Sequence, residues 1–226
     1  QEYIKNLAEK MVRRLFNMPD DFIVPSMTFD EAMNLYGCDK PDLRFDLKHR
    51  DVTDLFATSS FETFANIAKQ KGLVKAIFLS ASVGTLTRKD LDELTDIVKP
   101  FGGKGVANFK VENGQFSGGI SKFINSDLHQ KLENLLSEKG NGVWLFCADA
   151  NHDKAHACMD AVRRHMGTKF RMHRPGFAFL WVYDFPLLEW SQDDNRFAAR
   201  HHPFTSPKSS RMDDFFSKDK EILKKL

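Results

Sequence analysis

The sequence predicts an α+β protein, on two observations. Helical patterns alternate with short apolar runs through the middle of the chain, which indicates helices packed on a sheet. One run, VANFKV, is followed by Asn113-Gly114 and then by QFSGGI, and Asn-Gly supplies the positive φ values of a tight hairpin turn. A hairpin within such an alternation favours a mixed or antiparallel sheet over a doubly wound one. The helical patterns cover residues 60–70, 88–99, 126–138 and 152–165, and the apolar runs cover 74–79, 106–111 and 143–148.

The N-terminal segment predicts two further helices. The first carries an apolar stripe at helical spacing and is stopped by prolines. The second starts at Thr28, which fits an N-cap with Glu31 three residues later, and ends at Tyr36-Gly37. The charge-dense CDKPDLRF that follows predicts a loop or an extended crossing. The stripe consists of Ile4, Leu7, Met11, Leu15 and Phe16, and the prolines are Pro19 and Pro25.

The C-terminal segment opens with FAFLWVYDFPLLEW, which predicts an apolar, aromatic strand that ends at Asp184 and Pro186. The polar stretch SQDDNRF and the loop RHHPFTSP come after it. Composition therefore changes at both edges of the middle region. We expect one domain in two pieces, 1–47 and 171–226, around an inserted domain at 48–170.

Length, net charge and cysteine content limit the classes of protein to which this sequence can belong. A length of 226 residues suffices for one large domain or two smaller ones, and a net charge of +2 gives no general argument for a nucleic-acid partner. Three cysteines without an even, closely spaced framework fit a reducing cytoplasm, so we expect a cytoplasmic protein. No apolar run approaches the ~20 residues that span a bilayer, and no secretory signal opens the chain. Both ends fall within helical patterns, which indicates a piece of a longer protein.

A zinc site and a basic surface are the candidates within the middle region. His152 and His156 stand at i and i+4 of a helical pattern, a spacing that can hold zinc. Asp153 occupies the position where such metalloproteases have Glu, so a solvated helix start is the favoured interpretation, and Cys147 reads as a buried thiol. Basic residues could form a face for RNA or an ordinary solvated surface. They are Lys69, Lys71, Lys75, Arg88, Lys104, Lys110 and Lys122.

The histidine pair of RHHPFTSP is the third candidate. Histidine has an unperturbed pKa of about 6.5, so small changes in its surroundings decide its charge near neutrality. Pro203 and Pro207 restrict the backbone around His201 and His202. The segment is therefore either a stiffened loop that presents two imidazoles to a ligand or a surface turn with two solvated rings.

Long motifs in all three segments carry a resemblance to a known family. MTFDEAMNLYGCDKPDLRF, FLWVYDFPLLEW and RHHPFTSPK resemble, in order and spacing, the bacterial-type aspartyl-tRNA synthetases of class II. The middle, including LTRKDLDELTDIVKPFGGKGVANFKV, is similar to the GAD-type domain inserted in that family, which also occurs in subunits of tRNA-dependent amidotransferases. The resemblance implies a GAD-like α+β insertion flanked by two pieces of a class II catalytic domain with an antiparallel sheet.

The resemblance also implies an activity and its site. Enzymes of this family activate L-aspartate with ATP and Mg²⁺, transfer it to tRNA, and act as homodimers. Their HHPFT loop lies over the aminoacyl site, which implies that His201 contacts the bound aspartate and that His202 is its neighbour. Asp184 and Glu189 are implied to support the site from the scaffold, and DKPDLR is expected to be a structural junction. No metal ligand is implied within this sequence.

What this sequence lacks limits the implied activity. The class II motifs 1, 2 and 3, which form the dimer helix and hold ATP, are not in it, so we expect the segment alone to be inactive, with neither ATP nor Mg²⁺ bound. The alternative is a non-catalytic module that positions tRNA for an amidotransferase. Such subunits share only the inserted domain, whereas this chain also carries DFPLLEW and HHPFTSP.

Overall fold

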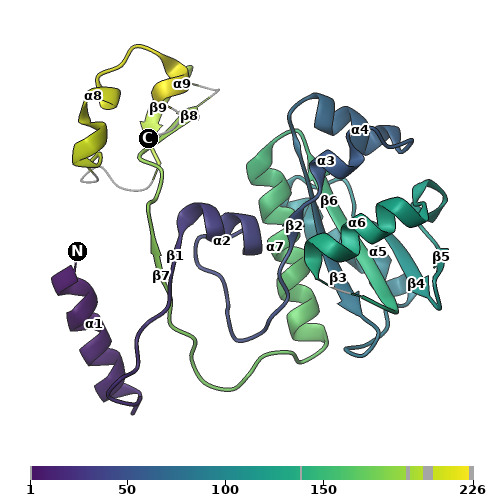
Figure 1. Cartoon of the computed structure of the whole chain (residues 1–226), viewed down its shortest axis with the longest axis horizontal. Coiled ribbons are helices and arrows are strands. Elements are labelled where there is room, and N and C mark those ends of the chain that lie inside the picture. Colours follow the sequence, from purple (N-terminus) through teal and green to yellow (C-terminus); the bar gives the residue numbers. More distant parts are fainter. Residues whose placement is uncertain (1, 138, 192–193, 201–205, 224–226) are drawn as a thin grey trace. The chain divides into compact units, whose positions relative to one another are not determined.

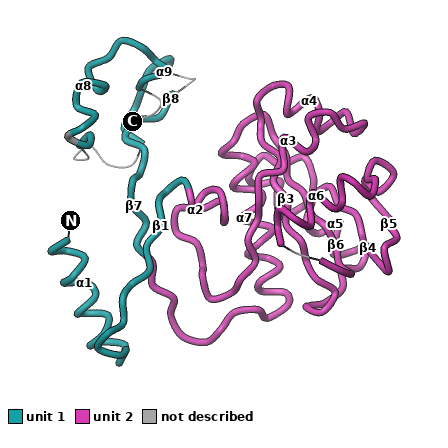
Figure 2. The backbone as a smooth tube through the Cα atoms, in the orientation of Figure 1, with its two compact units in different colours: residues 1–30, 181–226 teal, residues 31–180 magenta. Residues whose placement is uncertain are grey.

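The computed structural model describes residues 2–137, 139–191, 194–200 and 206–223. The chain divides into two compact units (Figure 2). The larger unit is Glu31–Leu180, and the smaller unit combines Gln1–Asp30 with Trp181–Leu226. None of the helices in the described part of the chain has the length and hydrophobicity that crossing a bilayer requires.

A five-stranded antiparallel sheet in the order β2-β3-β6-β4-β5 forms the centre of the larger unit (Figure 1). Its two long central strands pair from Leu73 opposite Asp149 to Ser80 opposite Gly142. The prediction of an α+β fold is therefore confirmed, with every pair in this sheet antiparallel. The strands are β2 (Arg50–Asp51), β3 (Leu73–Ser80), β4 (Ala107–Glu112), β5 (Gln115–Ser117) and β6 (Gly142–Asp149).

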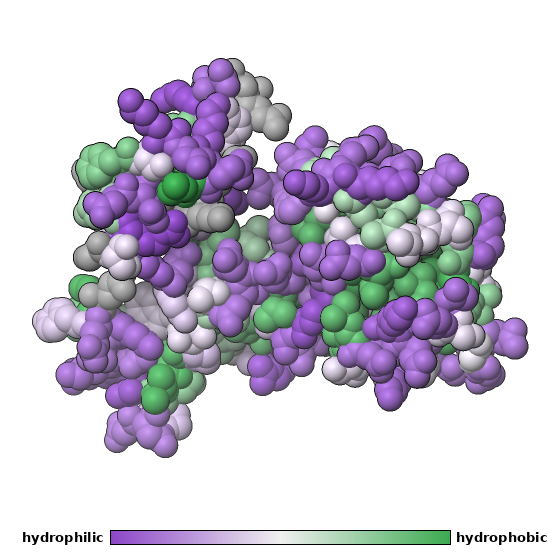
Figure 3. Space-filling view, turned by 45° about the horizontal axis from the view of Figure 1, so that its top comes forward, coloured by the Kyte–Doolittle hydropathy of each residue, from purple (hydrophilic) through white to green (hydrophobic). Residues whose placement is uncertain are grey.

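Helices cover both faces of this sheet. Along β3, Val74 and Phe78 join the hydrophobic cluster beneath α3, α4 and α6, whereas Ile77 and Leu79 join the cluster beneath α5 and α7. Because both faces are buried, the strands read as continuous apolar runs. On the outside, hydrophilic residues cover much of the face in Figure 3. The helical elements are α2 (Phe29–Tyr36), α3 (Thr53–Phe56), α4 (Glu62–Lys69), α5 (Arg88–Val98), η1 (Lys99–Phe101), η2 (Ser121–Phe123), α6 (Ser126–Leu136) and α7 (His152–Lys169).

Local sequence signals set the ends of these elements. Thr87 and Asp90 form a reciprocal capping box at the start of α5. The Asn125 side chain accepts a hydrogen bond from the Leu128 amide, 2.8 Å, at the start of α6. The predicted hairpin turn is confirmed, since Asn113 and Gly114 have φ values of 51° and 75° between β4 and β5. The four helices and three strands predicted for the middle region are all present.

The smaller unit consists of short elements. Strand β1 pairs in parallel with β7, from Ser26 opposite Trp181 to Thr28 opposite Tyr183, and β8 pairs with β9 in an antiparallel hairpin. The antiparallel pairing implied for the flanks thus holds for β8 and β9, while β1 and β7 are parallel. The elements are α1 (Glu2–Leu15), β1 (Ser26–Thr28), β7 (Trp181–Tyr183), β8 (Leu188–Ser191), β9 (Arg196–Ala199), η3 (Ser209–Arg211), α8 (Met212–Phe215) and α9 (Lys220–Leu223).

Apolar side chains of the smaller unit are more exposed than the sequence predicts. The resemblance to a strand of the class II sheet implies that the aromatic side chains of FLWVYDFP are core, but Tyr183 is 46% exposed, so this expectation is wrong for Tyr183. The stripe of α1 is exposed as well, including Met11 at 53% and Leu15 at 70%. The reason is that the described residues of β1, β7 and α1 supply few neighbouring elements to cover these faces.

Candidate functional site

Asp184 lies directly after β7, where the chain turns away from the strand. Its φ of 57° places it in the left-handed region, which Asp tolerates better than most residues. Its carboxylate forms an ion pair with Lys208, with 2.7 Å between Lys208 Nζ and Asp184 Oδ2. Both side chains are largely exposed, so the pair adds little to stability. It does tie the segment after β7 to the segment that follows the histidine loop.

Glu189 lies in β8, opposite Ala198 of β9. Its Oε2 is 3.8 Å from Nε of Arg200, and the Arg200 amide donates to the Leu187 carbonyl at 3.2 Å. The β8–β9 hairpin therefore fixes the residue that immediately precedes the histidine pair. The sequence identified Glu189 but missed β9, because RFAA is too short to show an alternating pattern.

An aromatic pair lies beside this hairpin. The rings of Phe29, the first residue of α2, and Phe185 have centroids 5.2 Å apart. The Arg200 guanidinium carbon lies 5.1 Å from the centroid of the Phe29 ring, within the range of a cation–π interaction. Residues near 29, 185 and 200 thus meet within the smaller unit and hold the base of the histidine loop. His201 and His202 themselves lie outside the described residues.

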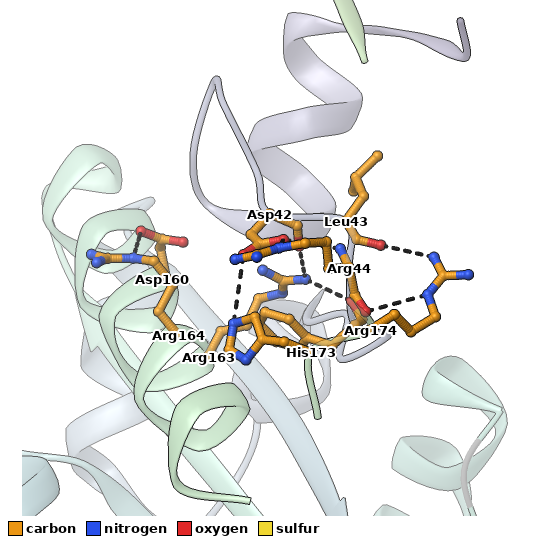
Figure 4. Close-up of polar contacts among 9 residues, drawn as sticks. Asp42, Leu43, Arg44, Asp160, Arg163, Arg164, His173 and Arg174 are labelled. Carbon is orange, nitrogen blue, oxygen red and sulfur yellow. Dashed lines mark hydrogen bonds and ion pairs between the residues drawn. The ribbon is translucent and has the colours of Figure 1, made fainter. Parts of the chain in front are cut away.

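The loop that begins with DKPDLR, residues 39–44, and continues to Leu47 is held by an arginine of α7, which Figure 4 shows beside Asp42. Fully buried Arg163 donates three hydrogen bonds to backbone carbonyls of this loop. Nε donates to Leu47 O at 2.7 Å, and Nη2 donates to Asp42 O at 2.8 Å and Phe45 O at 3.1 Å. The guanidinium also lies 4.0 Å from the centroid of the Phe45 ring. One arginine therefore satisfies carbonyls of a loop that has no strand partner.

A second set of contacts joins this loop to the end of the larger unit (Figure 4). Asp42 and Arg44 form an ion pair with 2.6 Å between Oδ2 and Nη2, and the Arg44 hydrogen bond lowers the pKa of Asp42 to about 2. His173 Nε2 lies 3.5 Å from the same carboxylate. Arg174 donates to the carbonyls of Leu43 and Arg44 at 3.2 and 3.3 Å. The two ends of the larger unit are thereby linked to each other.

A cluster of buried basic side chains, Lys75, His49 and His156, lies in the larger unit, and the sequence analysis missed it. Lys75 is fully buried, and its Nζ donates at 3.0 Å to Asn34 O in the last turn of α2, where the helix dipole favours a cation. Burial lowers the pKa of Lys75 to about 8 and that of His156 to about 4. Burial also lowers the pKa of His49, whose ring centroid lies 6.4 Å from that of His156. The sequence feature that could have revealed this cluster is the lysine inside the apolar run LVKAIFLS. Its burial removes Lys75 from the candidate basic face.

The two histidines of the zinc alternative, His152 and His156, differ in their surroundings. His152 Nε2 contacts Lys71 O at 2.8 Å, while His156 is buried. Asn151 caps α7 by accepting a hydrogen bond from the Lys154 amide, which confirms the interpretation as a helix start. Across the described ranges no group of three or more His, Cys, Asp or Glu residues could hold a metal ion. Cys147 is a buried thiol, as predicted, and burial raises its pKa well above the usual value.

Comparison with known proteins shows which proteins the chain resembles. The GAD domain family matches residues 64–159, which lie within the larger unit. The aspartate–tRNA ligase of Halalkalibacterium halodurans is 37% identical over 205 residues, 90% of this chain. The aspartate–tRNA(Asp/Asn) ligases of Hydrogenobaculum sp. and Symbiobacterium thermophilum are 36% and 38% identical, each over 94% of this chain.

The chain resembles aspartyl-tRNA synthetases over nearly all of its length. The similarity includes the GAD domain match and extends to both sides of it. The chain spans only about a third of the length of these synthetases, namely 34%, 36% and 37% of the three relatives named. The similarity is therefore to one region of an aspartyl-tRNA synthetase.

Proposed function

We propose that this chain is part of an aspartate–tRNA ligase, which activates L-aspartate with ATP and transfers it to tRNA. The observation that carries the proposal is the extent of the similarity. It covers up to 94% of the chain, whereas the GAD domain match covers only residues 64–159. A tRNA-positioning module of an amidotransferase would share the GAD domain alone, so this alternative is disfavoured.

The proposal also includes the assignment of the chain's segments to domains. We assign residues 48–170 to an inserted domain and residues 1–47 and 171–226 to the catalytic domain. ATP and Mg²⁺ serve the whole enzyme, but the described residues offer no cluster that fits a metal ion, so we derive no step through it. The partners are tRNA and a second copy of the whole enzyme. The three cysteines are free thiols, which supports the cytoplasm as the compartment.

We propose His201 as the residue that contacts bound aspartate, with His202 as its neighbour. Support comes from the base of the loop, where Arg200 is held by the Leu187 carbonyl, the Glu189 carboxylate and the Phe29 ring. A positioned imidazole donor favours a carboxylate over an amide, and a protonated ring adds charge complementarity. Asp184 and Glu189 then act on the loop through Lys208 and Arg200.

The test is kinetic, in the complete enzyme that contains this segment. Losing a hydrogen bond to a charged substrate costs about 1.5–3 kcal/mol, so His201→Ala should lower kcat/KM for aspartate roughly tenfold to a hundredfold, and that for ATP far less. His202→Ala should show a smaller loss. The matched control is His152→Ala, at an exposed histidine on α7. Unchanged aspartate kinetics in the His201 variant would make the loop an ordinary surface turn.

A further inference from the structure

The sheet of the larger unit has a notch at the end of β6. Strand β6 continues to Asp149, but its neighbour β4 begins only at Ala107, which pairs with Phe146. The last three residues of β6 therefore have no partner in β4. The chain before β4, residues 103–106, lies beyond the end of the ladder and forms no regular structure. The notch is therefore a place in the sheet where a strand position is vacant.

The pairing pattern fixes which backbone groups face this notch. Val74 of β3 pairs with Ala148. The Val74 carbonyl accepts from the Val52 amide and the Val74 amide donates to Thr53 Oγ1, each at 2.9 Å, so both groups point toward β2. Val74 and Ala148 are thus a non-hydrogen-bonded pair of the antiparallel ladder, and the amide and carbonyl of Ala148 point the other way. Within the described residues neither group has a backbone partner there.

The notch opens into a cavity of about 620 Å³, a volume typical of a ligand pocket. Phe64 and Ile67 of α4 line it on one face of the sheet, and Thr95 of α5 and Cys158 of α7 line it on the other. Gly105 contributes no side chain, and a Cβ there would meet only Thr95, at 3.8 Å. A ligand in this cavity would therefore lie between the helices of the two sheet faces. The amide and carbonyl of Ala148 would be the backbone donor and acceptor beside it.

We propose that this notch binds a short extended peptide, which adds to the edge of β6 and pairs with Ala148. A residue in an extended conformation presents its N–H and C=O on the same side, so one residue can exchange both hydrogen bonds with Ala148. The side chain of this residue lies on the same face as that of Ala148, toward α4, and the side chains of its two neighbours lie on the other face, toward α5 and α7. Both faces receive small apolar side chains. A nucleotide fits less well, because among the described residues that line the cavity Lys104 is the only basic one, and Asp149 lies there too.

The probe is the blocked pentapeptide acetyl-Ser-Val-Ala-Val-Ser-amide, titrated into the ¹⁵N-labelled 226-residue chain. We expect saturable amide shifts confined to residues 103–107 and 146–149, with a dissociation constant on the order of 1 mM. Exchange of the Ala148 amide should slow roughly tenfold or more at saturation. The matched peptide has a methyl group on the nitrogen of its central Ala, which removes the donor to the Ala148 carbonyl, and it should not bind.

Protein variants complete the test. Gly105→Leu fills the notch without a close backbone contact and should abolish the shifts, whereas Lys131→Leu, which adds the same side chain to exposed α6, should leave them unchanged. Saturable binding that requires the central N–H and an empty notch supports the proposal. No shift at about 10 mM peptide overturns it. So does equal binding of the methylated peptide, or binding of adenosine or uridine in preference to the peptide.

Discussion

Replacing Arg163 with Met should destabilise the larger unit severely. The buried guanidinium donates to three carbonyls, at 2.7, 2.8 and 3.1 Å. Each hydrogen bond from a charged donor contributes about 1.5–3 kcal/mol, but water can reach part of the loop once the arginine is gone. Removing one partner from a buried charged network costs about 3–5 kcal/mol, so we expect a loss of that size. A domain is stable by about 5–15 kcal/mol, so the variant should remain measurable.

The assay is equilibrium unfolding in urea, followed by the fluorescence of Trp144, which is fully buried in the larger unit. Trp181 and Trp190 are replaced by Phe in every protein compared, so that the signal reports on the larger unit alone. Arg88→Met, at the exposed first residue of α5, is the matched control and should change the free energy by less than about 0.5 kcal/mol. Hydrogen exchange should also accelerate in residues 42–47 of the Arg163 variant. A loss below about 1 kcal/mol, in a protein that still unfolds cooperatively, would refute the assigned role.

Two predictions concern pH. Because burial holds the pKa of His156 at about 4, the unfolded chain binds more protons below about pH 6.5. Stability should therefore fall as pH drops from 6.5 toward 4, by roughly 2–3 kcal/mol at pH 4.5, and His156→Leu should reduce this fall. An identical pH dependence in the variant would contradict the assignment. Because the pKa of Lys75 is about 8 in the folded chain and about 10.4 when unfolded, stability should rise between pH 8 and 10, by roughly 2 kcal/mol. Urea midpoints for Lys75→Met should lack that rise, and its persistence would show that another group causes it.

Local patterns determined most of the secondary structure of the larger unit. The four middle helices, the three long strands and the Asn113–Gly114 hairpin follow from hydrophobic period, capping residues and turn chemistry. These signals act within a few residues, so the sequence carries them whatever the tertiary context. The buried state of Cys147 was also predictable, since it lies within an apolar run.

Family motifs directed attention to Asp184 and Glu189, whereas the histidine pair stood out through its flanking prolines and received its role from the resemblance. The structure places Asp184 against Lys208 and Glu189 near Arg200, which no periodicity could show. His201 and His202 lie outside the described residues, so their role remains a prediction. The exposure of Tyr183 could not be foreseen either, because burial depends on which elements cover a strand.

Only the tertiary structure decided the features that join distant parts of the chain. Lys75 reaches the Asn34 carbonyl across 41 positions, and Arg163 reaches the Asp42 carbonyl across 121. The free amide and carbonyl of Ala148 likewise depend on where β4 begins relative to β6. Sequence periodicity reports which face of an element is apolar, but not which element will lie against it. The sequence therefore determined the helices and strands, and packing decided which polar groups are buried, which are paired and which remain open to a partner.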